Sequence, residues 1–219
     1  MMLKLVIGNK NYSSWSMRPW LAMHAAGIAF EEIFIPLYTD DKADTDRILS
    51  FSAAGKVPTL IDGDITVWDS LAIIEYLAEC FPEKKLWPEH RAERAHARSI
   101  SAEMHSGFLP LRSECGMNLH RPVCAVALSA DARANVARIE EIWLDCRERY
   151  GSRGPFLFGA FTAADAMFAP VVHRFRTYAI EVAPKATAYM ETMMRFPPFA
   201  EWTKAGIAET LVIAKFETV

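Results

Sequence analysis

The sequence predicts a small α/β domain followed by an all-helical domain. Residues 55–70 contain two β-branched, apolar runs on either side of a turn dipeptide, and strand and helix patterns precede them. After the proline-bearing stretch 81–90, helical patterns continue and no strand pattern returns. We therefore expect an α/β domain over residues 1–82 and an all-helical domain over residues 91–219.

The first three elements form a βαβ unit. Residues 3–7 read as a short strand, and the apolar spacing from Trp15 onward fits a buried helical face that Gly27 would end. Residues 30–35 read as a second strand. A crossover of this kind makes the two strands parallel and the connection right-handed.

A hairpin follows the βαβ unit. Residues 40–52 are polar and weakly helical, and the runs 59–61 and 65–68 read as two strands joined at Asp62-Gly63. Asp69-Ser70 then precedes a periodic apolar pattern, which predicts a helix with an acidic N-cap. The order β-α-β-α-β-β-α is that of a thioredoxin-like domain.

The second half reads as helices only. A long helical stretch over 91–115 and a second helix from Ser129 to about residue 151 are expected to pack as an antiparallel pair. The apolar, aperiodic loop between them has no predicted structure. Thr162 and Asp165 resemble a capping box, with Phe161 placed to pack near Ala166. Two more helices are predicted, over 184–195 and 198–214.

Composition narrows the possible functions. A chain of 219 residues with 52% hydrophobic content can bury a substantial core, and a net charge of −3 gives no broad basic field for nucleic acid. No apolar run approaches the length of a membrane span. The four cysteines and six histidines show no metal-ligand spacing. We expect a soluble cytoplasmic protein with no metal and with no nucleic-acid or membrane partner.

The stretch 55–70 resembles the glutathione-binding half of cytosolic glutathione transferases. Val57-Pro58 is either a strand start or a cis-proline bond that turns the backbone of Val57 outward. The resemblance implies that Val57 pairs through its backbone with glutathione, that Asp69 and Ser70 hold its γ-glutamyl end, and that Lys56 lies near its glycyl carboxylate. It also implies the glutathione transferase fold, a thioredoxin-like N-terminal domain plus an all-α C-terminal domain.

The loop before the first helix carries serines and no cysteine. Ser13 or Ser14 could be an ordinary N-cap, or a hydroxyl that donates a hydrogen bond to a bound sulfur and favours its thiolate. The absence of cysteine here disfavours a disulfide reductase. Ser13-Ser14-Trp15-Ser16-x-Arg18 resembles the Ser-Ser-Cys-Ser-x-Arg motif of zeta-class transferases, which include maleylacetoacetate isomerase. The resemblance makes Ser13, with Ser14 beside it, the thiol activator and places Trp15 in the glutathione site.

A substrate pocket is expected between the two domains. Met104, Phe108 and Arg112 would line it, although such a spacing also fits an ordinary core. Arg112 beside an apolar cleft would favour acidic substrates such as maleyl compounds. Arg18 is either paired with a carboxylate or solvated, and His105 is expected at the helix surface or interface rather than as a general base.

The resemblance implies a glutathione transferase that takes glutathione as co-substrate. Its thiolate would either be conjugated to a small electrophile or drive the cis-trans isomerisation of one, and the sequence leaves both outcomes open. The alternative is a non-catalytic binding or scaffold protein of the same fold. The family is usually homodimeric, so a homodimer is expected.

Overall fold

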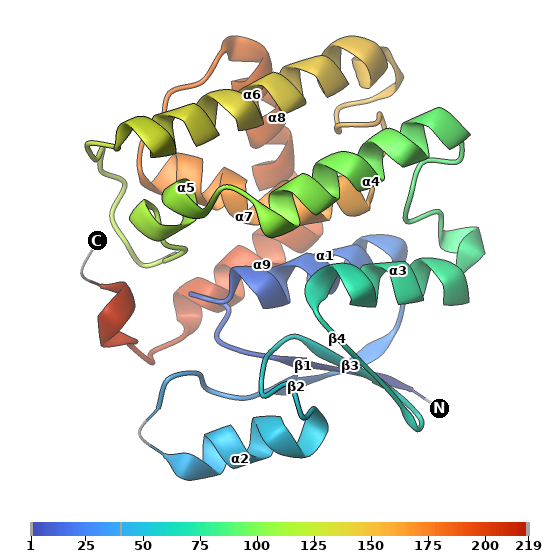
Figure 1. Cartoon of the computed structure of the whole chain (residues 1–219), viewed down its shortest axis with the longest axis vertical. Helices are drawn as coiled ribbons and strands as arrows, with labels where there is room; N and C mark the ends of the chain where they lie inside the picture. The colour runs from blue at the N-terminus through green and yellow to red at the C-terminus, as the bar shows by residue number, and fades with distance from the viewer. Residues whose placement is uncertain (1, 40, 218–219) are drawn as a thin grey trace.

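The computed structural model places a small sheet beneath a layer of helices (Figure 1). The structure describes residues 2–39 and 41–217. The predicted domain ranges and the predicted polar segment 40–52 also include residues 1, 40, 218 and 219, which lie outside the described residues. Helices α1 (Ser14–Ala26) and α3 (Ser70–Cys80) lie between the sheet and most of the other helices, whereas α2 (Lys42–Phe51) lies across the sheet from them. This layering confirms the predicted α/β half and helical half.

The sheet has four strands in the order β2-β1-β3-β4. Strand β1 (Leu3–Ile7) runs parallel to β2 (Phe30–Phe34) and antiparallel to β3 (Thr59–Asp62), and β4 (Ile65–Trp68) completes the hairpin. The predicted βαβ unit and the thioredoxin-like order are confirmed.

The hairpin turn lies one residue later than predicted. Asp62 pairs with Ile65 as the last pair of the β3–β4 ladder, so the turn residues are Gly63 and Asp64 rather than Asp62-Gly63. Gly63 has the positive φ of the turn, 57°, a conformation that glycine adopts without steric cost.

The helical half contains α4 (Arg91–Ser106), α5 (Leu109–Glu114), α6 (Ala130–Tyr150), α7 (Ala163–Thr177), α8 (Pro184–Arg195) and α9 (Pro197–Ala208). Short 3₁₀ turns occupy Pro82–Lys84, Gly151–Arg153 and Ala214–Phe216. Among the described residues, no helix combines the length and the apolar character needed to cross a membrane.

Two helix boundaries differ from the prediction. The helix expected over 91–115 breaks at Gly107 and Phe108, where Phe108 takes a left-handed φ of 60° and α5 starts in a new direction. The last helix ends at Ala208 rather than residue 214.

Helices α4 and α6 form the predicted antiparallel pair. Glu93 near the start of α4 pairs with Arg153 just beyond the end of α6, at 2.8 Å, and Glu103 near the end of α4 pairs with Arg138 early in α6, at 2.7 Å. Each pair therefore joins the beginning of one helix to the end of the other, as an antiparallel arrangement requires.

Helix α7 is the buried centre of the helical half, and its N-terminus confirms the predicted capping box. The Asp165 carboxylate accepts hydrogen bonds from the backbone N–H and the hydroxyl of Thr162 (2.8 and 3.1 Å), from the backbone N–H of Leu157 (3.0 Å) and from the Tyr189 hydroxyl (3.1 Å). Burial nevertheless raises the pKa of Asp165 to about 6. The Phe161 ring, predicted to pack near Ala166, stacks on Phe196 with the ring centroids 4.6 Å apart.

Candidate functional site

Ser13 is the N-cap of α1. Its buried hydroxyl accepts from the backbone N–H of Ser16 (3.3 Å) and donates to the Ser16 hydroxyl (2.8 Å), which also accepts from the N–H of Gly8 (3.2 Å). These bonds join the end of β1 to the first turn of α1. Ser13 is therefore an N-cap, one of the two roles predicted for it. The proton of its hydroxyl points to Ser16, inside the protein.

Ser14, the first residue of α1, has different partners. Its buried Oγ accepts a hydrogen bond from Nη2 of Arg174 on α7 (3.4 Å), and the described residues provide no acceptor for its own proton. Arg174 also donates to the backbone carbonyls of Arg112 and Cys115, which fix its position. A hydroxyl that accepts from a cation and lies at a helix N-terminus is well placed to donate to an anion.

Trp15 lies among cationic side chains. The guanidinium carbons of Arg18 and Arg112 lie 4.3 and 4.5 Å from its ring centroid, within the range of cation–π contacts, and the ring of His105 meets it edge-on at 5.2 Å.

Arg18 is only 2% exposed, and within the described residues its Nε and Nη1 have no hydrogen-bond partner. Burial and the charges of Arg112 and Arg174 together lower its pKa to about 9, against the opposing charge of Asp69. A buried cation needs an anionic partner, and neither of the alternatives predicted for Arg18, a paired or a solvated charge, is realised inside the protein. The cluster of Arg18, Arg112 and Arg174 can therefore accept an anion.

Asp69 and Ser70 form the N-terminus of α3, as predicted. Asp69 has a φ of 77°, and its Oδ1 accepts from the backbone N–H groups of Leu71 (2.9 Å) and Ala72 (3.4 Å). Its Oδ2 lies 3.1 Å from Nε2 of His105 on α4. Ser70 is completely buried, and its hydroxyl has no partner in the part of the chain that the structure describes.

The Val57-Pro58 peptide bond is cis, which is one of the two alternatives predicted for it. Thr59 pairs with Trp68 in the hairpin, so Val57-Pro58 and Asp69-Ser70 lie at the same end of the two strands. Lys56 is exposed beside them.

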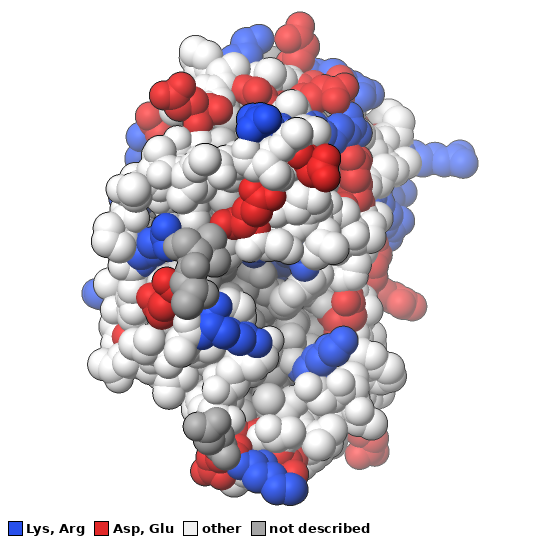
Figure 2. Space-filling view, turned by 60° about the vertical axis from the view of Figure 1, so that its left-hand side comes forward, with Lys and Arg blue, Asp and Glu red and all other residues white. Residues whose placement is uncertain are grey.

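The predicted pocket residues separate into two groups. Met104 and Phe108 are 1% and 8% exposed and belong to the hydrophobic core, the alternative that their spacing also allowed. Arg112 is only partly buried, beside Trp15, and donates to the backbone carbonyl of His105 (3.3 Å). The face drawn in Figure 2 is hollowed near mid-height, with Lys and Arg side chains in and beside the hollow.

Sequence reasoning missed Arg174, the residue that links α7 to Ser14. The available signal was a charged residue inside the apolar run 166–175, where nothing in the local pattern requires one. His105 was expected only at a surface or interface, and the structure joins it to Asp69 across that interface.

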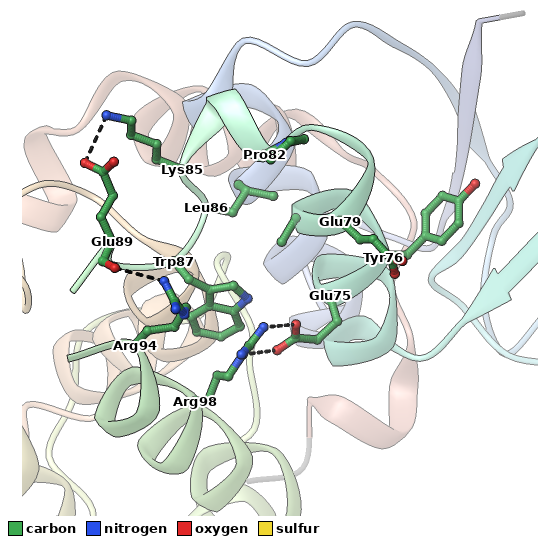
Figure 3. A pocket seen from close by; sticks show the side chains of 11 residues that line it. Glu75, Tyr76, Glu79, Pro82, Lys85, Leu86, Trp87, Glu89, Arg94 and Arg98 are labelled. Carbon is green, nitrogen blue, oxygen red and sulfur yellow. Dashed lines mark hydrogen bonds and ion pairs between the residues drawn. The ribbon is translucent and has the colours of Figure 1, made fainter. Parts of the chain in front are cut away.

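A cavity of about 720 Å³ lies away from these residues, between α3, the stretch 81–90 and α4 (Figure 3). Its charged side chains are mostly paired with each other. Arg98 binds both carboxylate oxygens of Glu75, and Lys85 binds Glu89 at 2.9 Å. None of the predicted site residues lines this cavity.

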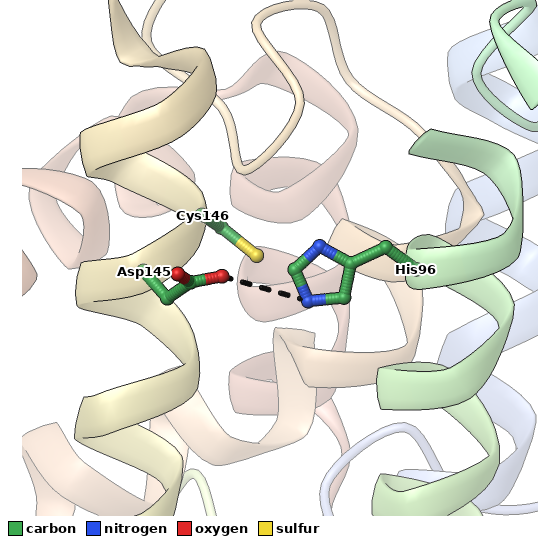
Figure 4. Close-up of side chains that lie close together, drawn as sticks. All are labelled: His96, Asp145 and Cys146. Atoms are coloured by element: carbon green, nitrogen blue, oxygen red, sulfur yellow. Dashed lines mark ion pairs between the residues drawn. The ribbon is translucent and has the colours of Figure 1, made fainter. Parts of the chain in front are cut away.

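His96, Asp145 and Cys146 are grouped between α4 and α6 (Figure 4). Arg149 lies 3.4 Å from Nδ1 of His96 and donates to Asp145 (3.1 Å), so a cationic side chain already contacts both His96 and Asp145. Burial raises the pKa of the Cys146 thiol to about 12, which disfavours the thiolate required of a ligand. We read the group as a contact between the two helices.

The fold and the site define a class: a thioredoxin-like protein with an added helical half and a cationic, anion-accepting site where the helix ends meet. A family model described as the glutathione S-transferase N-terminal domain matches residues 12–80, and one described as the C-terminal domain matches residues 126–205. Among curated relatives, the maleylacetoacetate isomerase of Rattus norvegicus is 30% identical over 80% of each chain. The chain therefore belongs to the glutathione S-transferase family.

Two further matches extend the comparison. Glutathione S-transferase 1 of Dianthus caryophyllus is 34% identical, and the match spans about half of each chain, 52%. The crystal structure of a Burkholderia glutathione transferase homolog with bound glutathione superimposes with a TM-score of 0.70 at 25% identity, covering 94% of this chain and 98% of that one.

Proposed function

We propose that this protein is a glutathione transferase that binds glutathione at the N-termini of α1 and α3 and stabilises its thiolate with a serine hydroxyl. The observation that carries the proposal is Ser14, whose hydroxyl accepts from Arg174 while its own proton has no acceptor among the described residues. Ser13 donates to Ser16 instead, so we assign thiol activation to Ser14 and capping to Ser13. The helix dipole of α1 and the nearby arginines add to the preference for a thiolate.

Glutathione would lie along the end of the β3–β4 hairpin. The buried, unpartnered hydroxyl of Ser70 and the N–H groups at the start of α3 suit the carboxylate of the γ-glutamyl group, and Asp69 suits its ammonium. The backbone of Val57 would pair with the cysteinyl part, with Lys56 near the glycyl carboxylate and Trp15 beside the tripeptide. In this proposal residues 1–82 form the glutathione-binding domain.

The electrophile would bind above the thiolate, against the helical domain of residues 91–219. The unpartnered Nε and Nη1 of Arg18, with Arg112 and Arg174 close to them, favour an electrophile that carries carboxylates, such as a maleyl compound. In conjugation the thiolate sulfur bonds to one carbon of an activated double bond, the π electrons move onto the adjoining carbonyl as an enolate, and the enolate takes a proton from solvent before the adduct leaves. In isomerisation the same enolate forms, the new carbon–carbon single bond rotates, and the enolate re-forms the double bond and expels the thiolate. Each outcome uses the same residues.

An ultraviolet difference titration of the thiolate of bound glutathione tests this proposal. In the wild type we expect the thiol pKa to fall by about two units below its usual value near 8.5, and to return toward that value in Ser14→Ala. Ser13→Ala, the matched control one residue away, should keep the lowered thiol pKa. Calorimetry on the same samples establishes that glutathione is bound in each variant.

Glutathione bound with an unshifted thiol pKa would favour the alternative, a non-catalytic binding or scaffold protein. No binding at all would contradict both the site and the chemistry. A shift lost in Ser13→Ala and kept in Ser14→Ala would exchange the roles of the two serines.

A further inference from the structure

His105 connects the helical half of the protein to the N-terminus of α3. It occupies the last turn of α4, and its Nε2 lies 3.1 Å from Oδ2 of Asp69. Both side chains are only partly exposed, 26% for His105 and 41% for Asp69. A contact between side chains this exposed contributes little to the free energy of folding. Its main effect is to orient the side chains of His105 and Asp69 relative to each other.

The two carboxylate oxygens of Asp69 have separate partners. Oδ1 accepts from the first N–H groups of α3, those of Leu71 and Ala72, and thereby caps the helix. Oδ2 faces His105. His105 therefore orients Oδ2, the oxygen of Asp69 that does not cap α3.

The proton of His105 can be assigned from its partner. An ionised carboxylate only accepts hydrogen bonds, so Nε2 carries the proton and Nδ1 is an acceptor. Nδ1 is buried, and no partner for it exists among the described residues. Burial lowers the pKa of His105, the charges of Arg18 on α1 and Arg112 on α5 lower it further, and only Asp69 opposes them. His105 is thus neutral near pH 7 and donates to Asp69 without cancelling its charge.

We propose that His105 is a positioning residue of the glutathione site: it holds Oδ2 of Asp69 for the ammonium of the γ-glutamyl group and leaves the negative charge free to bind it. This inference rests on the proposed function. A neutral imidazole donor orients the carboxylate, whereas an imidazolium would form an ion pair with it and compete with the ammonium. Glutathione should therefore bind more weakly as His105 becomes protonated.

Three variants test the proposal. His105→Ala removes the donor, His105→Gln keeps an N–H donor that does not titrate, and Ser106→Ala is a control at the next, exposed position, where the hydroxyl only bonds back to the carbonyl of Ala102. We would measure the Kd for glutathione by calorimetry between about pH 5 and 8, together with KM for glutathione and kcat.

In His105→Ala we expect Kd and KM for glutathione to rise about tenfold, with little change in kcat at saturation. His105→Gln should recover most of the affinity, and Ser106→Ala should match the wild type. As pH falls, Kd should rise more steeply in the wild type than in His105→Gln.

A wild-type affinity in His105→Ala, or equal losses in the Ala and Gln variants, would overturn the positioning role. So would equally steep pH profiles for the wild type and His105→Gln. If the wild type does not bind glutathione, that result contradicts both the proposed function and this inference. Binding by the wild type with no effect of His105→Ala overturns this inference alone.

Discussion

At the candidate site, two buried side chains have polar atoms whose hydrogen bonds are incomplete. The hydroxyl of Ser70 and two guanidinium nitrogens of Arg18 are buried without partners in the described residues, although nearly all buried polar groups in proteins are hydrogen-bonded. They lie with Ser14, Asp69 and their neighbours, whereas the cavity of about 720 Å³ has mostly paired charges. This contrast supports the proposed site at the helix N-termini.

The buried charge of Arg18 predicts stabilisation by small dianions. Maleate or another dicarboxylate should bind the folded state through the unpartnered Nε and Nη1 of Arg18 and raise Tm as its concentration rises. Differential scanning fluorimetry across a dicarboxylate series measures it.

Arg18→Met should lose most of this stabilisation and should itself be no less stable without the anion, since it removes an uncompensated buried charge. Arg47→Met, at an exposed position of α2 on the other side of the sheet, is the matched control and should respond as the wild type does. An equal rise of Tm in Arg18→Met and the wild type would contradict the assignment of Arg18 as an anion partner.

At the scale of the element, the N-terminus of α7 predicts a specific pH dependence of stability. The folded pKa of Asp165, about 6, lies above the ordinary value of 3.8 expected in the unfolded chain, because burial outweighs its four hydrogen bonds. A raised pKa means that the folded state holds the proton more tightly. The stabilisation that Asp165 contributes to the folded state is fully present below about pH 4 and is lost as pH rises through about 6.

Urea unfolding of the wild type and Asp165→Asn between about pH 4 and 7 tests this sign. The free energy of unfolding of the wild type minus that of Asp165→Asn should decrease with rising pH across the window. Asp64→Asn, in the exposed hairpin turn, is the control and should show no such trend. A difference that increases with pH would show that the hydrogen bonds from Leu157, Thr162 and Tyr189 outweigh burial.

Most elements could be predicted from local patterns, because capping, glycine stops and apolar periodicity act over a few residues. The N-caps Ser13, Asp69, Ser129 and the Thr162 box are all present in the structure. The break between α4 and α5 had local signals that the prediction of one helix did not use, Gly107 and then Pro110 in the first turn of α5. The direction that α5 takes after the break depends on distant contacts, because α5 packs against α6.

At the scale of the whole molecule, the candidate site joins residues that no local pattern connects. Ser14, Asp69 and Ser70 could be found from the sequence, because helix N-termini have recognisable caps. Arg174 lies 160 positions from Ser14, and His105 lies on a different half of the fold from Asp69. Their roles depend on how the helical half docks on the sheet, which the periodicity of single helices does not specify.

The same docking leaves one edge of the sheet apolar and uncovered, which bears on assembly. Strand β4 is the outer strand, and Ile65 and Trp68 at its two ends are 50% and 55% exposed. Exposed edge strands with large apolar side chains are surfaces on which chains associate. We therefore keep the expectation of a homodimer and place β4 in its interface. Light scattering after gel filtration should give twice the chain mass of 24.6 kDa.

Trp68→Glu should shift that mass toward the single chain, because burying a carboxylate in an apolar contact is unfavourable. Val123→Glu changes a side chain that is 61% exposed in the loop between α5 and α6, away from β4, and should leave the mass unchanged. A wild type with the mass of one chain at micromolar concentration would rule out a stable homodimer. A dimer that persists in Trp68→Glu would show that the interface lies elsewhere than β4. The first outcome thus tests the expected homodimer, and the second tests the position of its interface.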